Sequence, residues 1–134
     1  MKRAVLYADG ACRGNPGPAG SGAALVNEDG HVVAEAMKHL GNGTNNVAEY
    51  TALIIGLEEA LRHDVEELEV RMDSKLVVEQ MNGNWKVRDP KLRPLAIRAG
   101  ELLARFPKRR MRHIPRDQNA IADLLANRAI DEDR

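Results

Sequence analysis

The sequence lacks the features of several common protein classes. Cys12 is its single cysteine, which excludes an internal disulfide and any zinc site built from several cysteines. No apolar run approaches the roughly 18 residues that indicate a membrane span. The N-terminus shows no signal-peptide pattern, because Lys2 and Arg3 are followed by only a short apolar stretch before Asp9. We therefore expect a cytoplasmic protein in a reducing compartment.

The chain also lacks net charge, with 20 basic and 20 acidic residues, so bulk charge indicates no polyanionic partner. The charges are unevenly distributed, however. Residues 84–116 contain eleven lysines and arginines but only Asp89 and Glu101 as acids. This indicates either a basic surface opposite an acidic one or an ordinary solvated helix followed by an exposed strand. The length of 134 residues fits a single domain spanning 1–134.

Hydrophobic periodicity and turn signals predict a mixed α/β protein. Three strands, at 3–8, 20–27 and 31–40, form an antiparallel meander. They are followed by a helix at 46–63, a strand at 67–73, helices at 74–83 and 94–106, a strand at 108–114 and a helix at 119–130. In the last helix we expect Ile121, Leu124 and Leu125 to share one apolar side. This order predicts a mixed sheet with helices packed on it.

Four acidic residues occupy positions where they can converge. Asp9 ends the first strand and enters the stretch "YADGACRGNPGPAGSGAALV", which holds five glycines and two prolines. Asp73 ends the strand that follows the long helix. If these two strands are parallel neighbours, both carboxylates emerge at one sheet edge, where open α/β sheets bind ligands. Glu49 lies in the first turn of the long helix, and Asp123 lies in the last helix.

Each acid also has an ordinary structural explanation. Glu49 fits a capping arrangement with Asn46 at the start of the long helix. Asp73 could cap the short helix that follows it. Asp123 could be a solvated helix residue, and Asp9 a turn residue that bonds its own backbone. All four explanations must hold together for the acids to have no common role.

Four motifs occur in an order that is similar to ribonuclease H of type 1. They are "YADGACRGNPGPAGSGA", "TNNVAEYTAL", "VRMDSKLVVEQMNGNWKV" and "NAIADLLAN", and they cover nearly the whole chain. The resemblance implies the ribonuclease H-like fold, a five-stranded mixed sheet flanked by helices. It also maps the four metal-binding carboxylates of the family onto Asp9, Glu49, Asp73 and Asp123. The glycines precede no Gly-Lys-Ser/Thr, so the chain has no P-loop.

The activity implied by the resemblance is hydrolysis of the RNA strand in RNA/DNA hybrids, giving 5′-phosphate and 3′-hydroxyl ends. Two Mg²⁺ ions would neutralise charge on both sides of the phosphorus, with Mn²⁺ as a substitute. Magnesium prefers oxygen ligands, which explains carboxylates rather than histidine or cysteine. In this scheme Asp9 bridges both ions, Asp73 and Glu49 complete the coordination, and Asp123 holds the ion on the water side.

A basic residue near Asp123 would assist proton transfer or product release. Many relatives carry a histidine on a glycine-containing loop about ten residues before the last aspartate. His113 has that spacing, but "HIPRDQN" lacks the glycines, and the sequence places His113 at a strand end. We therefore favour Arg116 as the catalytic assistant, with an ordinary solvated arginine as the alternative.

The resemblance implies that backbone amides and short amide side chains read the ribose 2′-hydroxyl in the minor groove. The residues expected to contact substrate are Gly10, Cys12, Arg13, Gly14, Asn15, Thr44, Asn45, Asn46, Asn84 and Trp85. Thr44 and Asn84 match positions that hold a DNA-strand phosphate, and Trp85 would pack against a sugar. Asn42 replaces an arginine that the family often carries, which weakens the expected phosphate pocket.

One departure from some bacterial relatives lies in the middle of the chain. Those relatives insert a basic helix and loop after the "NGNWKV" region, whereas this chain runs through "RDPKLRPL" into the next helix. The sequence thus resembles the form that lacks the basic protrusion. Lys86, Arg88, Lys91 and Arg93 would supply phosphate contacts in its place, so binding should weaken with salt.

The expected partner is an RNA/DNA hybrid, bound by a monomer without membrane attachment. Two other classes stay open. Another nuclease of the same superfamily would cut a junction or double-stranded RNA, but the asparagine-rich "TNN" and the glycine loop favour a reader of the 2′-hydroxyl. A nonenzymatic module would bind hybrids or metal without cutting, and the four intact acids argue against it.

Overall fold

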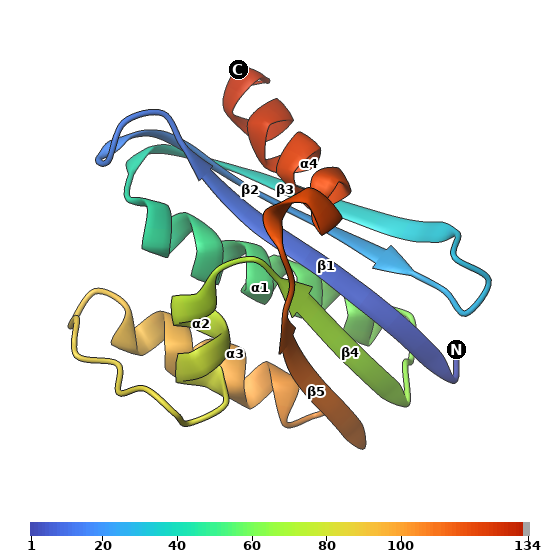
Figure 1. Cartoon of the computed structure of the whole chain (residues 1–134). Helices are drawn as coiled ribbons and strands as arrows, with labels where there is room; N and C mark the ends of the chain where they lie inside the picture. Colours follow the sequence, from blue (N-terminus) through green and yellow to red (C-terminus); the bar gives the residue numbers. More distant parts are fainter. Residues whose placement is uncertain (133–134) are drawn as a thin grey trace.

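A five-stranded mixed sheet lies at the centre of this computed structural model, which describes residues 1–132 (Figure 1). The strands are β1 Arg3–Cys12, β2 Gly17–Val26, β3 Val32–Gly43, β4 Glu67–Met72 and β5 Lys108–His113. They lie in the order β3-β2-β1-β4-β5. The first three form an antiparallel meander, while β4 pairs in parallel with both β1 and β5. The predicted mixed sheet is confirmed.

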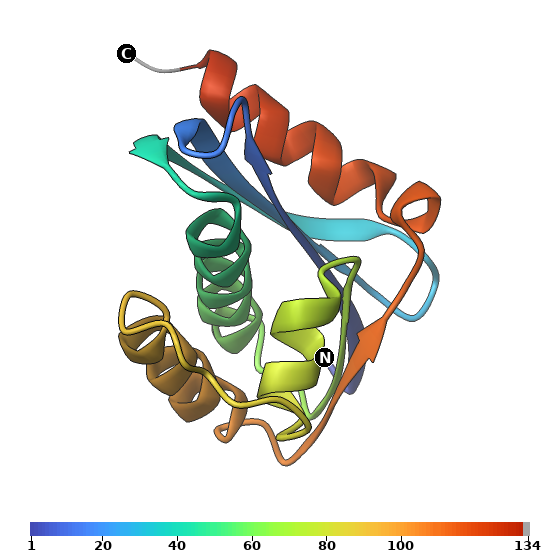
Figure 2. The same cartoon turned by 60° about the vertical axis from the view of Figure 1, so that its left-hand side comes forward.

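The helices cover the two faces of the sheet unequally. They are α1 Asn45–Arg62, α2 Lys75–Met81, α3 Arg93–Leu103 and α4 Ala120–Asp131, and a short 3-10 turn, η1 Arg116–Gln118, precedes the last of them. The first three lie on one face, and α4 lies alone on the other (Figures 1 and 2). Within residues 1–132, no helix combines the length and the apolar character needed to cross a membrane.

The main hydrophobic core lies between the sheet and α1. Leu6 of β1 and Leu53 and Leu57 of α1 are fully buried in it. Gly56 allows the helix to approach closely, since a Cβ atom there would lie 2.9 Å from Cδ2 of Leu6. Each buried leucine contributes about 1.5–3 kcal/mol to stability. This packing holds α1, and with it Glu49, against β1.

On the opposite face, α4 packs against the bare backbone of β2. A side chain at Gly22 would overlap Leu125 and Ala126 of the helix. The buried stripe of α4 consists of Ala122, Leu125, Ala126, Ala129 and Ile130. Leu124 is 61% exposed, so the expectation that it shares the apolar side was wrong. Successive residues of a helix are rotated by about 100°, so Leu124 points away from the stripe that contains Ala122 and Leu125.

The glycine-rich stretch forms a hairpin rather than a long loop. β1 extends beyond the predicted end at residue 8, because it pairs with β2 as far as Cys12 opposite Ala19. Only residues 13–16 separate the two strands. Gly10 and Cys12, expected in a loop, are therefore strand residues, and Asp9 lies inside β1 rather than at its end.

Hydroxyl side chains cap the two helices that flank the site. The Thr44 hydroxyl accepts a hydrogen bond from the backbone N–H of Val47 at the start of α1. The Ser74 hydroxyl accepts a hydrogen bond from the backbone N–H of Val77 at the start of α2. The capping explanations for Asn46 with Glu49 and for Asp73 were therefore wrong. Glu49 lies one turn inside α1, not in its first turn.

Candidate active site

Three of the predicted acids come together at one edge of the sheet. Carboxylate oxygens of Asp9, Glu49 and Asp73 all lie within 4.8 Å of one another. Asp9 is contributed by β1, Glu49 by α1, and Asp73 by the residue that follows β4. Elements separated by up to 64 positions in the sequence thus supply one cluster of oxygen ligands.

Parallel pairing of β1 and β4 brings the two aspartates together. The last paired residues of the two strands are Tyr7 and Arg71. Asp9 lies two positions after Tyr7, and Asp73 lies two positions after Arg71. Because side chains alternate along a strand, Asp9 leaves β1 on the same face as Tyr7. The expectation that both carboxylates emerge at one sheet edge is confirmed.

Glu49 reaches the cluster because α1 touches the backbone of β1. The N–H of Gly10 donates a 2.6 Å hydrogen bond to Oε1 of Glu49. A side chain at Gly10 would overlap the backbone between Ala48 and Glu49. Glycine at position 10 is therefore required by this contact between strand and helix.

The electrostatics of the cluster favour a bound cation. Asp9 and Glu49 are only 4% and 6% exposed. Burial raises the pKa of Asp9, and the carboxylates of Glu49 and Asp73 raise it further. Burial also raises the pKa of Glu49, against the opposing effect of the Gly10 hydrogen bond. A divalent cation would remove this repulsion, and an all-oxygen donor set fits Mg²⁺ or a related hard cation.

Asn119 joins the cluster to the sheet, a role that was not predicted from the sequence. Its side-chain nitrogen donates to the carbonyl of Ala8 at 3.0 Å and to Oδ1 of Asp73 at 3.2 Å. The residue is fully buried, and within the described part of the chain its Oδ1 has no hydrogen-bond partner. A buried asparagine needs polar partners, but Ala8 and Asp73 lie far from it in the sequence, so no local signal indicates this role.

The fourth acid, Asp123, stands in the same cavity but outside the tight cluster. This cavity has a volume of about 410 Å³ and is lined by all four acids together with Asn127 and Arg116. Asn127 donates a 3.4 Å hydrogen bond to Oδ1 of Asp123. The side chain of Asp123 is 36% exposed, so it faces the open part of the cavity.

Arg116 and His113 occupy different environments. A guanidinium nitrogen of Arg116 lies 4.0 Å from Oδ1 of Asp123, and Arg116 lines the cavity. His113 is the last residue of β5, as the sequence predicted, and is not among the residues lining the cavity. The structure therefore places Arg116, and not His113, beside the fourth acid.

The residues expected to contact substrate fall into two groups. Gly10, Cys12, Arg13 and Asn45 line the acidic cavity. Gly14, Asn15, Thr44 and Asn46 lie in the adjoining turn and helix start, where Oδ1 of Asn15 accepts a 3.1 Å hydrogen bond from the N–H of Asn45. Asn84 and Trp85 follow α2 and do not line the cavity, and Trp85 is 43% exposed beside Lys75.

Arg13 already has partners in the structure. Its guanidinium lies 2.5 Å from Oδ1 of Asp131 and 3.5 Å from Oδ1 of Asn127, both on α4. The hairpin turn and the last helix are thereby linked across the cavity. Both members of the Arg13–Asp131 ion pair are largely exposed, so the pair can exchange with other partners at little cost.

Known proteins resemble the chain over nearly its whole length. A family profile described as "Reverse transcriptase-like" matches residues 7–129. The chain is 48% identical over 130 residues to ribonuclease HI of Halobacterium salinarum, a match that covers 97% of this chain and 65% of that protein. It is 35% identical over 143 residues to ribonuclease H of Pseudomonas fluorescens, covering 96% and 93% of the two chains.

Solved structures agree with these sequence matches. LC11-RNase H1, isolated from compost and crystallised in complex with an RNA/DNA hybrid, superposes with a TM-score of 0.89 at 43% identity, covering 96% of this chain and 97% of that one. RNase H1 from Halobacterium salinarum gives a TM-score of 0.93 at 48% identity, covering 98% and 99%. The chain spans 65% of the halobacterial sequence and 36% of a bifunctional Mycobacterium tuberculosis relative.

Proposed function

The chain belongs to the type 1 ribonuclease H family, and we propose that it is an endoribonuclease that hydrolyses the RNA strand of RNA/DNA hybrids. The observation that carries this proposal is the cluster of Asp9, Glu49 and Asp73, whose oxygens lie within 4.8 Å of one another. The hybrid bound by LC11-RNase H1 supports the choice of substrate. Hydrolysis breaks the bond between phosphorus and the 3′ oxygen, leaving 5′-phosphate and 3′-hydroxyl ends.

The acids would hold two divalent cations, Mg²⁺ with Mn²⁺ as a substitute. Bound there, the ions would neutralise the phosphate and lower the pKa of the attacking water. Asp9, the most buried acid of the cluster, would contact both ions. Glu49 and Asp73 would complete the coordination, and Asp123, at the open side of the cavity, would hold the ion on the water side.

Neighbouring residues would keep the ligands in position. The Gly10 N–H orients the Glu49 carboxylate, and the Asn119 amide orients Asp73. Arg116 would assist turnover from its position near Asp123, either by stabilising charge or by helping the product to leave. We assign it this catalytic role in preference to His113.

Recognition of the two strands would come from the surrounding loops. Gly10, Cys12, Gly14 and the side chains of Arg13, Asn15, Asn45 and Asn46 would face the RNA minor groove and its 2′-hydroxyls. Thr44 and Asn84 would hold a phosphate of the DNA strand, with Trp85 against a sugar. We expect the protein to act as a monomer on this substrate.

One experiment tests the activity. The protein is incubated with an RNA/DNA hybrid, double-stranded RNA, double-stranded DNA and a four-way junction of matched sequence, with and without Mg²⁺. We expect cutting of the hybrid alone, in its RNA strand and only with the metal. The Asp9→Asn variant serves as the control for contaminating nuclease. Cutting of the junction but not the hybrid would contradict the proposal, and hybrid binding without cutting would indicate a nonenzymatic module.

A further inference from the structure

The basic segment seen in the sequence divides into two surfaces in the structure. Lys86, Arg88, Lys91 and Arg93 lie between α2 and α3 or at the start of α3, and phosphate contacts were expected from them. The remaining cluster lies on β5, whose sequence "KRRMRH" forms one edge of the sheet. The proposed function gives this second group no role.

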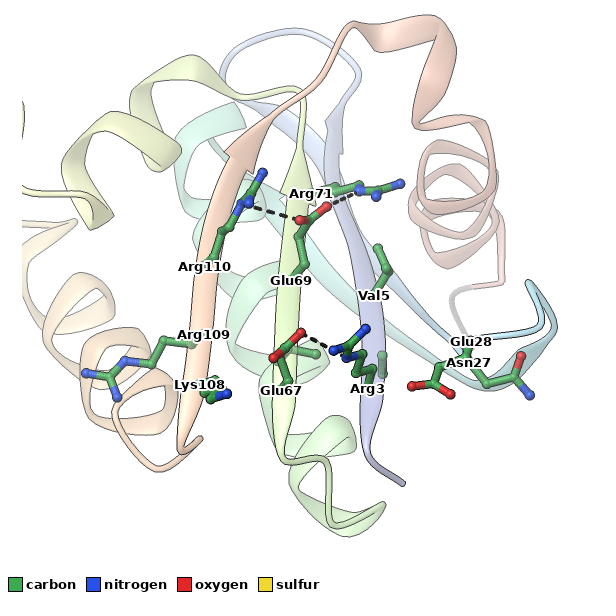
Figure 3. Close-up of a pocket in the computed structure, with 12 residues that line it drawn as sticks. Arg3, Val5, Asn27, Glu28, Glu67, Glu69, Arg71, Lys108, Arg109 and Arg110 are labelled. Atoms are coloured by element: carbon green, nitrogen blue, oxygen red, sulfur yellow. Dashed lines mark hydrogen bonds and ion pairs between the residues drawn. The ribbon is translucent and has the colours of Figure 1, made fainter.

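β5 and β4 border an uncovered part of the sheet. α4 packs on β1, β2 and β3, and it leaves the same face of β4 and β5 bare (Figures 1 and 3). A hollow of about 710 Å³ lies there. All-parallel sheets normally have both faces covered, and the exposed face of the parallel pair β4 and β5 is therefore a candidate binding surface.

The bare area carries cations at alternate strand positions. We call it the basic face and define it by Arg3, Arg71, Lys108, Arg110 and Arg112. The first four line the hollow, and Arg112 continues the same row of β5. Arg109 also belongs to the lining, but Figure 3 shows its side chain directed away from the others. From Lys108 to Arg112 the row is about 13 Å long.

Three acids line the hollow, Glu28, Glu67 and Glu69, against the five cations of the basic face, so positive charge is in excess. Glu69 lies among three guanidinium groups, at 2.6 Å from Arg71, 3.4 Å from Arg110 and 3.8 Å from Arg112. One carboxylate cannot satisfy all the donors of three arginines, each of which has five N–H groups. Glu67 is paired with Arg3 at 3.2 Å, and within residues 1–132 no acid lies within ion-pair distance of Lys108. Donors therefore remain for an anionic partner.

The basic face lies beside the acidic cavity, because residues of the two surfaces are close neighbours along the chain. Arg71 of β4 precedes Asp73 by two positions, and Arg112 of β5 pairs with Arg71. Arg116 follows on η1 and lines the cavity itself. A nucleic-acid strand held at the acids would therefore have Arg116, Arg71 and Arg112 nearby, with the rest of the β5 row beyond them.

We propose that the basic face binds the phosphates of single-stranded RNA that continues from the cleaved strand beyond the hybrid; this inference rests on the proposed function. The RNA strand is the one held at the acids, so it is the strand that can pass Arg116 and reach Arg112 and Arg110. An acidic protein segment would also fit the charge. The position of the basic face beside the cavity favours RNA, because a protein partner has no need of that position.

Binding measurements with matched hybrids test this inference. The duplex is kept constant and is blunt, or carries a single-stranded extension at the 3′ or the 5′ end of the RNA, or the same extension on the DNA strand. Affinity is measured in EDTA to prevent cutting. We expect at least one RNA extension to bind roughly tenfold more tightly than the blunt hybrid. Three added phosphate contacts should also steepen the slope of log K against log salt by about 2.

Variants locate the effect. Lys108→Gln/Arg110→Gln/Arg112→Gln should lose the advantage of the RNA extension and keep the wild-type affinity for the blunt hybrid. The control Arg62→Gln/Arg98→Gln/Arg105→Gln removes the same charge from exposed positions of α1 and of α3 and its end. It should keep the advantage. Single Arg110→Gln gives a smaller loss and preserves the test if the triple variant does not fold.

Several outcomes would overturn the inference. They are an absence of any advantage from RNA extensions, an equal advantage from DNA extensions, and an equal loss in the control variant. Binding of a polyglutamate peptide to the wild type but not to the β5 variant, without an RNA effect, would identify a protein partner instead. Cutting of the blunt hybrid in Mg²⁺ reports on the proposed function separately, so the two failures are distinguishable.

Discussion

The backbone N–H of Gly10 donates a 2.6 Å hydrogen bond to Oε1 of Glu49, and this bond ties the first strand to the first helix inside the acidic cluster. The donor can reach the carboxylate because position 10 has no side chain. Strand, helix and the Glu49 carboxylate are therefore fixed by the same contact, and five predictions follow from it and its surroundings.

Gly10→Ala should reduce both stability and activity. The added methyl group would overlap the backbone at Ala48 and Glu49, and overpacking of this kind costs about 1–3 kcal/mol. Urea unfolding measures the loss, and hybrid cleavage should fall with it as Glu49 is displaced. Gly100→Ala is the matched control, since a methyl group there meets nothing within 4 Å. It lies inside α3 and should raise stability by about 0.5–1 kcal/mol. Equal effects of the two variants would contradict the packing argument.

Asp9→Asn should abolish cleavage and stabilise the metal-free protein. Cleavage should fall by more than roughly 100-fold, the usual cost of removing a group that stabilises the transition state. At the same time the substitution removes one of three mutually repelling carboxylates. A higher Tm than the wild type in EDTA, with no further rise on adding Mg²⁺ or Mn²⁺, is the expected result. Glu35→Gln, an acid on β3 away from the cluster, should leave the metal response unchanged.

The stability of the metal-free protein should fall as pH rises. In the folded state the pKa values of Asp9 and Glu49 lie above the ordinary 3.8 and 4.5. At a pH between the ordinary and the raised pKa values, the folded state therefore binds more protons than the unfolded state. Stability is then lost as pH increases through the raised values. Between pH 6 and pH 8 the wild type should lose at least about 1 kcal/mol more than Asp9→Asn. Urea unfolding at both pH values measures this, and identical slopes for the two proteins would rule it out.

Asn119→Ala should weaken the site more than its effect on folding explains. The substitution removes a buried donor from the carbonyl of Ala8 and from Asp73, which costs about 1–3 kcal/mol. Because Asp73 loses its orientation, the metal concentration for half-maximal cleavage should also rise. A metal dependence equal to that of the wild type, despite the lost stability, would show that Asn119 is structural only.

Arg116→Ala should reduce turnover, whereas His113→Ala should not. Of these two residues, Arg116 is the one that lies near Asp123, and a general acid–base or charge-stabilising group is worth roughly 100-fold in rate. Steady-state cleavage separates turnover from KM. The pH–rate profile of His113→Ala should have the same shape as that of the wild type. The reverse pattern would assign the role to His113.

Much of the fold could be predicted from the sequence because its elements carry local signals. Alternation of apolar residues identified β4, Gly83 marked the end of α2, and Pro90 marked the loop before α3. The extent of β1 could not be predicted, because pairing of Cys12 with Ala19 depends on the partner strand and not on local composition. The exposure of Leu124 was likewise decided by the seating of α4 on Gly20 and Gly22.

The site, like the fold, could be predicted only in part. Positions of the acids at strand ends predicted that Asp9 and Asp73 meet, since parallel pairing carries them to one edge. Asn119 was missed because its two partners, Ala8 and Asp73, lie far away in the sequence. Bonds of this kind appear only when the chain has folded, so a single sequence contains no direct sign of them.

The lone position of α4 on its face has a consequence for how activity is lost. The helix carries Asp123, its approach carries Asn119 and Arg116, and the core between the sheet and α1 does not depend on it. Local unfolding of this one helix would therefore disconnect part of the site while the other three acids stay assembled. On warming, the protein would become inactive before it melts, and hydrogen exchange in α4 would report that earlier event.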